Sequence, residues 1–428
     1  MNPASLEKPE NTAAARDRQG FGTQGPADTE SQVHGLYLHL PFCFHKCHYC
    51  DFFSVVTNRD ADDAGQDPQA QFTDALLAEF EPWCNGDGRV GTAEDADTPA
   101  IRELRPSTIF AGGGTPTYLR PELWDRLLDA LRHRGVLERV DEFTVEANPE
   151  TVTPELMRQL AAGGVNRVSI GAQSFDRSSL EALERWHDPD NVPRAVDACR
   201  SAEIENISLD LIFAIPGQTL DMLDRDLDRL IALRPTHLSI YGLTYEPQTA
   251  LTARLRVGKV TPIDESTERA MYDRVMTRLA DAGYEHYELS NWCRRDPTND
   301  LRCAHNLHYW RNRHWLGLGP GAASHIAGRR WRNQPNLPAY LDGSPHPPRT
   351  DEEHLPPEQR VGEQLMLGLR LAEGVSLHWL NQQLPDDDPR HATIREAVDL
   401  ALLEITDTSL RLTREGRFVA DSILAKLL

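Results

Sequence analysis

The sequence has few cysteines and no long apolar run, and each absence excludes a class of protein. Seven cysteines among 428 residues are too few for the disulfide framework of a secreted scaffold. No stretch approaches the roughly 18 consecutive apolar residues of a membrane-spanning helix. The N-terminus also lacks the apolar segment of a secretory signal. We therefore expect a cytoplasmic protein with no transmembrane segment.

Positive charge is scarce as well. The chain has 45 Lys and Arg residues against 66 Asp and Glu residues, which gives a formal net charge of −21. An acidic surface repels the phosphates of a nucleic acid, so we expect no nucleic acid among the partners. At roughly 150 residues per domain, the length predicts two or three domains.

The distribution of apolar residues predicts four regions. Residues 1–34 hold few large apolar side chains and predict a disordered leader. In residues 35–333 short strands alternate with helices, which predicts an α/β fold with a parallel sheet, and about six such units indicate a partial barrel. Residues 334–357 contain seven prolines and predict a linker. Residues 358–428 predict a small C-terminal helical, winged-helix-like domain.

Three of the cysteines, Cys43, Cys47 and Cys50, fall within eight positions. Thiolates at this spacing can hold three irons of a four-iron cluster and leave the fourth iron open to a small molecule. The alternative is a zinc site completed by His45 or His48. Zinc sites of that kind use a second, distant pair of ligands, and the sequence shows no obvious pair, so the spacing favours a cluster.

Seven motifs, beginning in the first predicted strand, resemble those of the radical S-adenosylmethionine (SAM) family. The closer likeness is to the oxygen-independent coproporphyrinogen III oxidases and their HemW haem-chaperone branch. In chain order, the motifs are Tyr37–Cys43 (YLHLPFC), Cys50–Phe52 (CDF), Phe110–Thr117 (FAGGGTPT), Val145–Pro149 (VEANP), Ser169–Phe175 (SIGAQSF), Leu209–Ile212 (LDLI) and His305–Trp310 (HNLHYW).

This resemblance implies a partial (β/α)6 radical SAM barrel that binds a 4Fe-4S cluster through Cys43, Cys47 and Cys50. It also implies SAM as a cofactor, with its methionyl end on the open iron. Taken singly, Arg185 is also compatible with a surface cation and Asp210 with a strand-end cap. The positions that match the family's cofactor contacts are Tyr37, Tyr49, Gly113, Gly114, Thr115, Glu146, Gln173, Arg185 and Asp210.

One departure separates two functions within the resemblance. The oxidases carry a further Cys two positions after the third cluster Cys, and here that position is Phe52. The resemblance therefore implies a haem chaperone that passes haem to acceptor haemoproteins, with an electron donor for the cluster and a possible homodimer. His305 or His308 of the last motif is the expected haem ligand, and the alternative is that His305 and its aromatic neighbours only pack. The alternative function is an oxygen-independent coproporphyrinogen III dehydrogenase.

Overall fold

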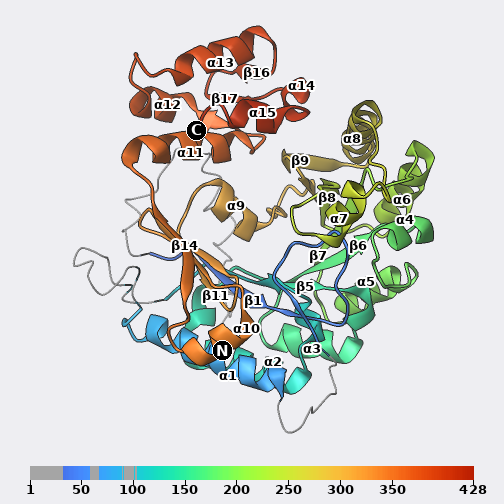
Figure 1. Cartoon of the computed structure of the whole chain (residues 1–428), viewed down its shortest axis with the longest axis vertical. Coiled ribbons are helices and arrows are strands. Elements are labelled where there is room, and N and C mark those ends of the chain that lie inside the picture. Colours follow the sequence, from blue (N-terminus) through green and yellow to red (C-terminus); the bar gives the residue numbers. More distant parts are fainter. Residues whose placement is uncertain (1–31, 58–66, 89, 91–100, 102–103) are drawn as a thin grey trace, which may run out of the picture.

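The computed structural model of the chain describes residues 32–57, 67–88, 90, 101 and 104–428. Its largest element is a twelve-stranded sheet (Figure 1). Nearly all of the predicted leader lies outside the described residues. In sheet order the strands are β14 (Arg349–His354), β13 (Arg329–Asn333), β12 (Ala323–Ile326), β11 (Trp315–Leu318), β1 (Gly35–Leu40), β4 (Thr108–Gly113), β5 (Glu142–Ala147), β6 (Arg167–Gln173), β7 (Asn206–Phe213), β8 (His237–Gly242), β10 (Asn291–Arg294) and β9 (Tyr284–Glu288).

The centre of the sheet is parallel, as the alternation of strands and helices predicts. Strands β11, β1, β4, β5, β6, β7 and β8 all run in the same direction. Strands β14 and β9 are the two edges, so the sheet stays open. The predicted α/β fold with a partial barrel is therefore confirmed. All parallel strands end at the same edge, which is where sites form in such folds.

Helices connect the parallel strands and cover the outer face of the sheet (Figure 1). Thr153 and Thr219 cap two of them by accepting a backbone N–H with the hydroxyl oxygen. No helix among the described residues has the length and apolar character needed to cross a bilayer. The helices and 3-10 helices between β1 and β9 in the chain are α1 (Pro68–Cys84), η2 (Pro116–Tyr118), α2 (Pro121–His133), η3 (Val136–Arg139), η4 (Pro149–Thr151), α3 (Pro154–Ala162), α4 (Arg177–Ala182), α5 (Asn191–Ser201), α6 (Leu220–Ala232), α7 (Ala250–Arg256) and α8 (Glu265–Asp281).

The two faces of the sheet differ in polarity because successive side chains of a strand point to opposite faces. Leu36, Leu38 and Leu40 of β1 are buried in the main apolar core with the covering helices. The alternate residues Tyr37 and His39 lie on the other, inner face. Polar and charged side chains therefore gather on the inner face without interrupting the core.

The Pro-rich segment 334–357 differs from the linker that its composition predicts. It contains α10 (Leu337–Gly343) and the edge strand β14, which pairs antiparallel with β13. Its Tyr340 is almost fully buried against the main core. Proline at the first turn of a helix is compatible with the helix, so proline content alone did not reveal the ordered elements.

The C-terminal region has its own apolar core and its own sheet. The three-stranded antiparallel sheet makes this region mixed rather than purely helical, and the winged-helix likeness stays a prediction. A further helix, α9 (Ala304–Trp310), lies between the C-terminal helices and the large sheet (Figure 1). The C-terminal elements are α11 (Pro357–Leu369), β15 (Val375–Ser376), α12 (Leu377–Gln383), α13 (Arg390–Asp399), β16 (Leu403–Ile405), β17 (Ser409–Leu412), α14 (Arg414–Arg417) and α15 (Ala420–Leu424).

A buried carboxylate ties α1 to the antiparallel end of the sheet. Glu79 accepts hydrogen bonds from Gly319 N (2.9 Å), Asn333 Nδ2 (2.6 Å) and the Tyr340 hydroxyl (2.6 Å). Glu79 is only 4% exposed. Three segments that are distant in sequence therefore share one acceptor.

We expect Glu79→Ala to lower the midpoint of thermal unfolding more than Tyr340→Phe does. The first change leaves three buried donors without an acceptor, and each unpaired donor costs about 1–3 kcal/mol. The second change removes one donor and leaves the carboxylate with two. Differential scanning calorimetry of both variants measures the order, and equal shifts would contradict the tether.

Candidate functional site

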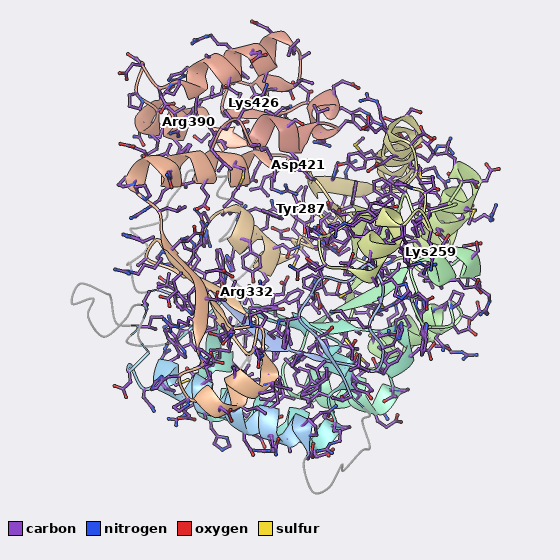
Figure 2. The ribbon with its side chains drawn as sticks, in the orientation of Figure 1. Lys259, Tyr287, Arg332, Arg390, Asp421 and Lys426 are labelled. Atoms are coloured by element: carbon purple, nitrogen blue, oxygen red, sulfur yellow. The ribbon has the colours of Figure 1, made fainter. Side chains whose placement is uncertain are left out.

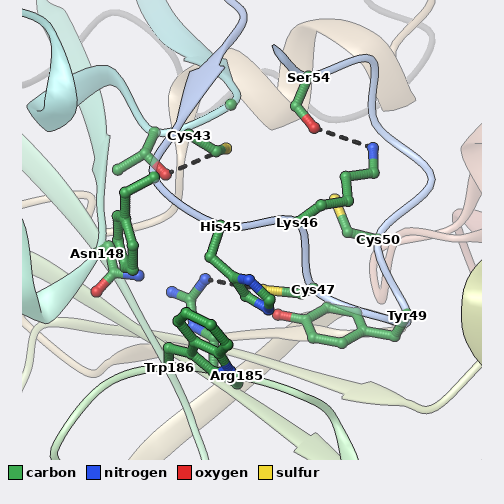
Figure 3. A pocket seen from close by; sticks show the side chains of 13 residues that line it. Cys43, His45, Lys46, Cys47, Tyr49, Cys50, Ser54, Asn148, Arg185 and Trp186 are labelled. Atoms are coloured by element: carbon green, nitrogen blue, oxygen red, sulfur yellow. Dashed lines mark hydrogen bonds between the residues drawn. The ribbon is translucent and has the colours of Figure 1, made fainter. Parts of the chain in front are cut away.

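The three clustered cysteines lie on the loop after β1, at the carboxyl edge of the parallel sheet. The loop begins at β2 (Phe42–Cys43), which pairs with β3 (Val55–Val56) and holds the two ends of the loop together. It borders an open pocket with an empty volume of about 430 Å³ (Figure 3). The lining residues are Cys43, Phe44, His45, Lys46, Cys47, Tyr49, Cys50, Ser54, Gly114, Thr115, Asn148, Arg185 and Trp186.

Polar groups contact two of the sulfur atoms. Cys43 Sγ lies 3.5 Å from Thr115 Oγ1, and Arg185 Nη1 donates to Cys47 Sγ over 3.6 Å. Burial raises the pKa of Cys43, and it raises the pKa of Cys50 to about 11. These two thiols are therefore protonated near neutral pH, and metal binding displaces their protons.

The glycine turn after β4 lies directly against the start of the cysteine loop. A Cβ atom on Gly114 would lie 2.6 Å from the carbonyl carbon of Pro41 and 2.8 Å from the oxygen of Leu40. Gly113 has φ +100°, in the left-handed region that favours glycine. Only glycine at these positions allows the two backbones to approach this closely.

Two carboxylates lie on the inner face of β5 and β7, the strands on either side of β6. Glu146 Oε2 accepts from Gly113 N over 3.3 Å, and Asp210 accepts from Ser169 Oγ at 3.0 and 3.3 Å. Burial, with the added charge of Asp210, raises the pKa of Glu146 to about 7. Burial also raises the pKa of Asp210, and hydrogen bonds from serine hydroxyls oppose that rise. This pair suits a ligand that carries positive charge.

Tyr49 and Arg185 lie at the pocket beneath the cysteine loop, and Gln173 lies next to Arg185. Tyr49 and Arg185 line the pocket (Figure 3). Gln173 ends β6 with φ 60°. A Cβ atom on Gly171 would lie 2.6 Å from Gln173 Nε2 and 3.1 Å from Arg185 Nη2, so both side chains converge above that glycine. Arg185 thus lines the pocket and contacts Cys47 and the carbonyl of Gly171 rather than projecting into solvent.

Tyr37 is on β1 and lies beside these two carboxylates. Its hydroxyl is 3.1 Å from His39 Nδ1. Burial and the neighbouring Glu146 charge raise the pKa of Tyr37 well above its usual value, so its hydroxyl stays protonated. The predicted residues of the barrel thus gather at one edge: Tyr37, Cys43, Cys47, Tyr49, Cys50, Gly113, Gly114, Thr115, Glu146, Gln173, Arg185 and Asp210.

His305 is hydrogen-bonded within the protein in this structure, and its role as a haem ligand stays a prediction. Its Nδ1 lies 2.7 Å from Thr108 Oγ1 and its Nε2 lies 2.9 Å from the Tyr309 hydroxyl, so both ring nitrogens are hydrogen-bonded. The residue is 1% exposed, and its ring stacks on Phe110 at 5.2 Å. His308 is buried as well, with Nε2 3.0 Å from Ser107 Oγ. Packing explains both histidines.

Two family profiles match the chain, one over the barrel and one over the C-terminal region. The Radical SAM superfamily matches residues 37–230, which contain the cysteine loop and most of the parallel sheet. The HemN C-terminal domain matches residues 355–419, which form most of the C-terminal region.

Curated relatives match over nearly the whole chain. Heme chaperone HemW of Mycobacterium tuberculosis is 34% identical, covering 94% of this chain and 97% of that protein. The protein of the same name from Bacillus subtilis is 31% identical over 92% and 98%, and that from Lactococcus lactis is 35% identical over 79% and 82%. The chain belongs to the HemW family of radical SAM proteins.

A solved structure shares the fold of this HemW-family chain. Coproporphyrinogen III oxidase (HemN) from Escherichia coli, a radical SAM enzyme, superimposes with a TM-score of 0.74, covering 94% of this chain and 91% of that one. The two sequences are 21% identical. The likeness extends to both the barrel and the C-terminal region.

The pocket suits the iron–sulfur cluster that the family implies better than a single ion. Among the described residues, no three His, Cys, Asp or Glu side chains gather as one ion requires. Three thiols instead line one pocket. Arg185 Nε is buried beside them and has no hydrogen-bond partner, and a buried cationic donor stabilises an anionic group such as a thiolate-bound cluster.

Sequence reasoning did not assign several residues of the pocket wall. His45 stacks on Trp186 with a centroid distance of 3.8 Å, and its Nε2 is 3.0 Å from the Glu184 carbonyl. Lys46 Nζ donates to Phe52 O and to Ser54 Oγ, which ties the loop to itself. His45 stands between two of the cysteines in the sequence, which indicates that it lies near them, whereas no local pattern indicates its stacking on Trp186.

We expect replacement of Cys43, Cys47 or Cys50 by Ala to abolish the broad visible absorbance of the anaerobically reconstituted protein. Each change removes one of three thiols at the pocket. Cys199→Ala is the matched control, because Cys199 is fully buried in the main core and its sulfur contacts Met157. An intact four-iron spectrum in the Cys47 variant would contradict the assignment.

Proposed function

We propose that this chain is a haem chaperone that binds a 4Fe-4S cluster, SAM and haem and passes haem to acceptor haemoproteins. The observation that carries the proposal is its likeness to Heme chaperone HemW proteins over nearly the full length of both chains. Phe52 supports it from within the sequence, because the oxidases have cysteine at that position. The chain works in the cytoplasm, with a protein electron donor for the cluster, and a homodimer is its proposed assembly.

Cys43, Cys47 and Cys50 hold the cluster in this proposal. When bound and reduced, the cluster supplies an electron to SAM. Arg185 donates to Cys47 Sγ over 3.6 Å and places a cation beside the cluster, whose thiolate-bound form is anionic. Thr115 is the hydroxyl partner of Cys43. Burial raises the pKa of Cys43, and the Thr115 hydroxyl lowers it.

The glycine turn and the carboxylates hold SAM. Gly113, Gly114 and Thr115 bring backbone groups close to its methionyl end, where a side chain would block approach. Glu146 and Asp210 accept hydrogen bonds from the SAM cation or its ribose. Both are buried, so their charge is poorly screened and attracts a cationic ligand strongly.

We expect the affinity for SAM to depend on pH through Glu146. Burial and the Asp210 charge raise its pKa to about 7 even though Arg167 lowers it, so at lower pH SAM must first displace a proton. Affinity should therefore be about tenfold weaker at pH 6 than at pH 8, the ratio of the ionised fractions. Isothermal titration of the cluster-loaded protein measures this ratio.

The control for this pH dependence is Glu146→Gln, which keeps the shape and loses the titration. Its affinity should be weaker at pH 8 and change less between pH 6 and 8. If the wild type and this variant show the same pH dependence, another group is responsible.

Haem binding and turnover separate the chaperone from the coproporphyrinogen III dehydrogenase. We expect a stoichiometric Soret band on haem titration, and no protoporphyrinogen IX from coproporphyrinogen III with SAM and reductant. His305→Ala should leave the band in place, because both ring nitrogens of His305 are already bonded within the protein. Repeated turnover by the wild type would contradict the chaperone function and support the dehydrogenase function. Loss of the band in His305→Ala would show that the HNLHYW helix opens to ligate iron.

A further inference from the structure

A buried chain of hydrogen bonds leads away from the Asp210 carboxylate along the inner face of the sheet. Ser208 Oγ lies 3.3 Å from Asp210 Oδ1 and 2.9 Å from His237 Nδ1. His237 Nε2 lies 2.8 Å from the Tyr287 hydroxyl. The backbone N–H of Cys303 donates to the same hydroxyl over 3.3 Å. Ser208 and His237 are fully buried, and Tyr287 is 4% exposed.

The chemistry of the two ends fixes the direction of every bond. A backbone N–H only donates, so the Tyr287 hydroxyl accepts from Cys303. An ionised Asp210 only accepts, so Ser208 donates to it and accepts from His237 Nδ1. This leaves Nε2 of the neutral ring to accept from Tyr287. Burial lowers the pKa of His237 far below its usual value, so the ring is neutral and its proton is on Nδ1. That N–H donates to Ser208, whose hydroxyl donates to Asp210. The whole chain therefore stabilises the ionised carboxylate.

The far end of the chain is anchored where the barrel meets the C-terminal region. Cys303 immediately precedes α9, and Glu142 accepts from the next two backbone N–H groups at 2.9 and 3.1 Å. The backbone oxygen of Tyr287 accepts from Ala372 N, in the segment after α11, over 2.9 Å. Tyr287 is on β9, the edge strand of the large sheet, and lies on its side toward the C-terminal helices in Figure 2.

We infer that Ser208, His237 and Tyr287 are positioning residues for SAM, through which the segment that enters α9 sets the orientation of Asp210. The inference rests on the proposed function, in which Asp210 contacts SAM. Tyr287 itself belongs to the apolar core of the C-terminal region. The HNLHYW helix and the C-terminal region thus support the cofactor site from a distance, without contacting the cofactor.

Several other groups also act on Asp210, so the test compares variants rather than absolute values. Ser169 and Ser239 donate to it from the flanking strands. Loss of one donor in the chain leaves these bonds and raises the pKa of the carboxyl only in part. The titratable and charged groups that face it are Glu146 from β5, Arg167 from β6, Tyr241 from β8 and Tyr49 from the cysteine loop.

Tyr287→Phe tests the inference, because it removes one hydroxyl and keeps the ring. In the cluster-loaded protein we expect about two- to tenfold weaker SAM binding, the usual effect of one lost hydrogen bond. The affinity should also begin to fall at a higher pH than in the wild type. Tyr284→Phe is the matched control, because its buried hydroxyl is on the same strand but donates to Pro235 O.

The outcomes separate this inference from the proposed function. Cluster content and haem affinity should stay unchanged in both tyrosine variants. If Tyr287→Phe binds SAM with the affinity and pH profile of Tyr284→Phe, the inference is wrong. If Tyr287→Phe does not take up a cluster, Ser208→Ala decides, since it breaks the chain beside Asp210. A cluster-loaded wild type that does not bind SAM contradicts the proposed function instead.

Discussion

The hydrogen-bond register between β1 and β4 is the constraint on which the site depends. It pairs Leu40 with Gly113 at the ends of the two strands. The ladder continues past both strands, because Gly114 N donates to Leu40 O and Thr115 N donates to Phe42 O at 2.9 and 2.8 Å. The start of the cysteine loop and the glycine turn are therefore held by the same ladder. A shift of one residue would move the inward side chains of β1 to the opposite face and separate the thiols from the turn.

Charged side chains lie on the inner face of the open barrel, where little water reaches them. The outer face is closed by helices, whereas Glu142, Glu146, Arg167 and Asp210 lie on the inner face with little solvent. Buried charges are costly unless they are hydrogen-bonded or paired. Glu142 is satisfied by backbone N–H groups and Asp210 by hydroxyls, but Glu146 has one backbone partner. The least satisfied carboxylate is thus the one nearest the glycine turn, where a cationic ligand compensates for the missing partners.

Local patterns predicted the parts of the site that depend on neighbours in the sequence. Cysteine spacing, the glycine turn and the alternation of strands and helices all act over a few residues, and they predicted the cysteine loop and the parallel sheet. One hydrogen-bond partner of His305, Thr108, is nearly 200 residues away on β4, although the other, Tyr309, is four residues away. The pairing of β14 with β13 depends on a neighbouring strand. Sequence pattern holds no direct record of such contacts. For this reason the sequence does not indicate that His305 is buried in the core or that residues 349–354 form an edge strand.

The shared fold limits where a chaperone and an oxidase can differ. HemN from Escherichia coli has the same barrel and C-terminal region at 21% identity, so the architecture does not decide between the two activities. Side chains such as Phe52 are one place where the two can differ. Phe52 is 60% exposed at the end of the cysteine loop, and its carbonyl accepts from Lys46. Phenylalanine offers neither the proton nor the nucleophile of a thiol. The loop therefore keeps its shape through a backbone contact, while the side chain beside the pocket has lost its chemistry.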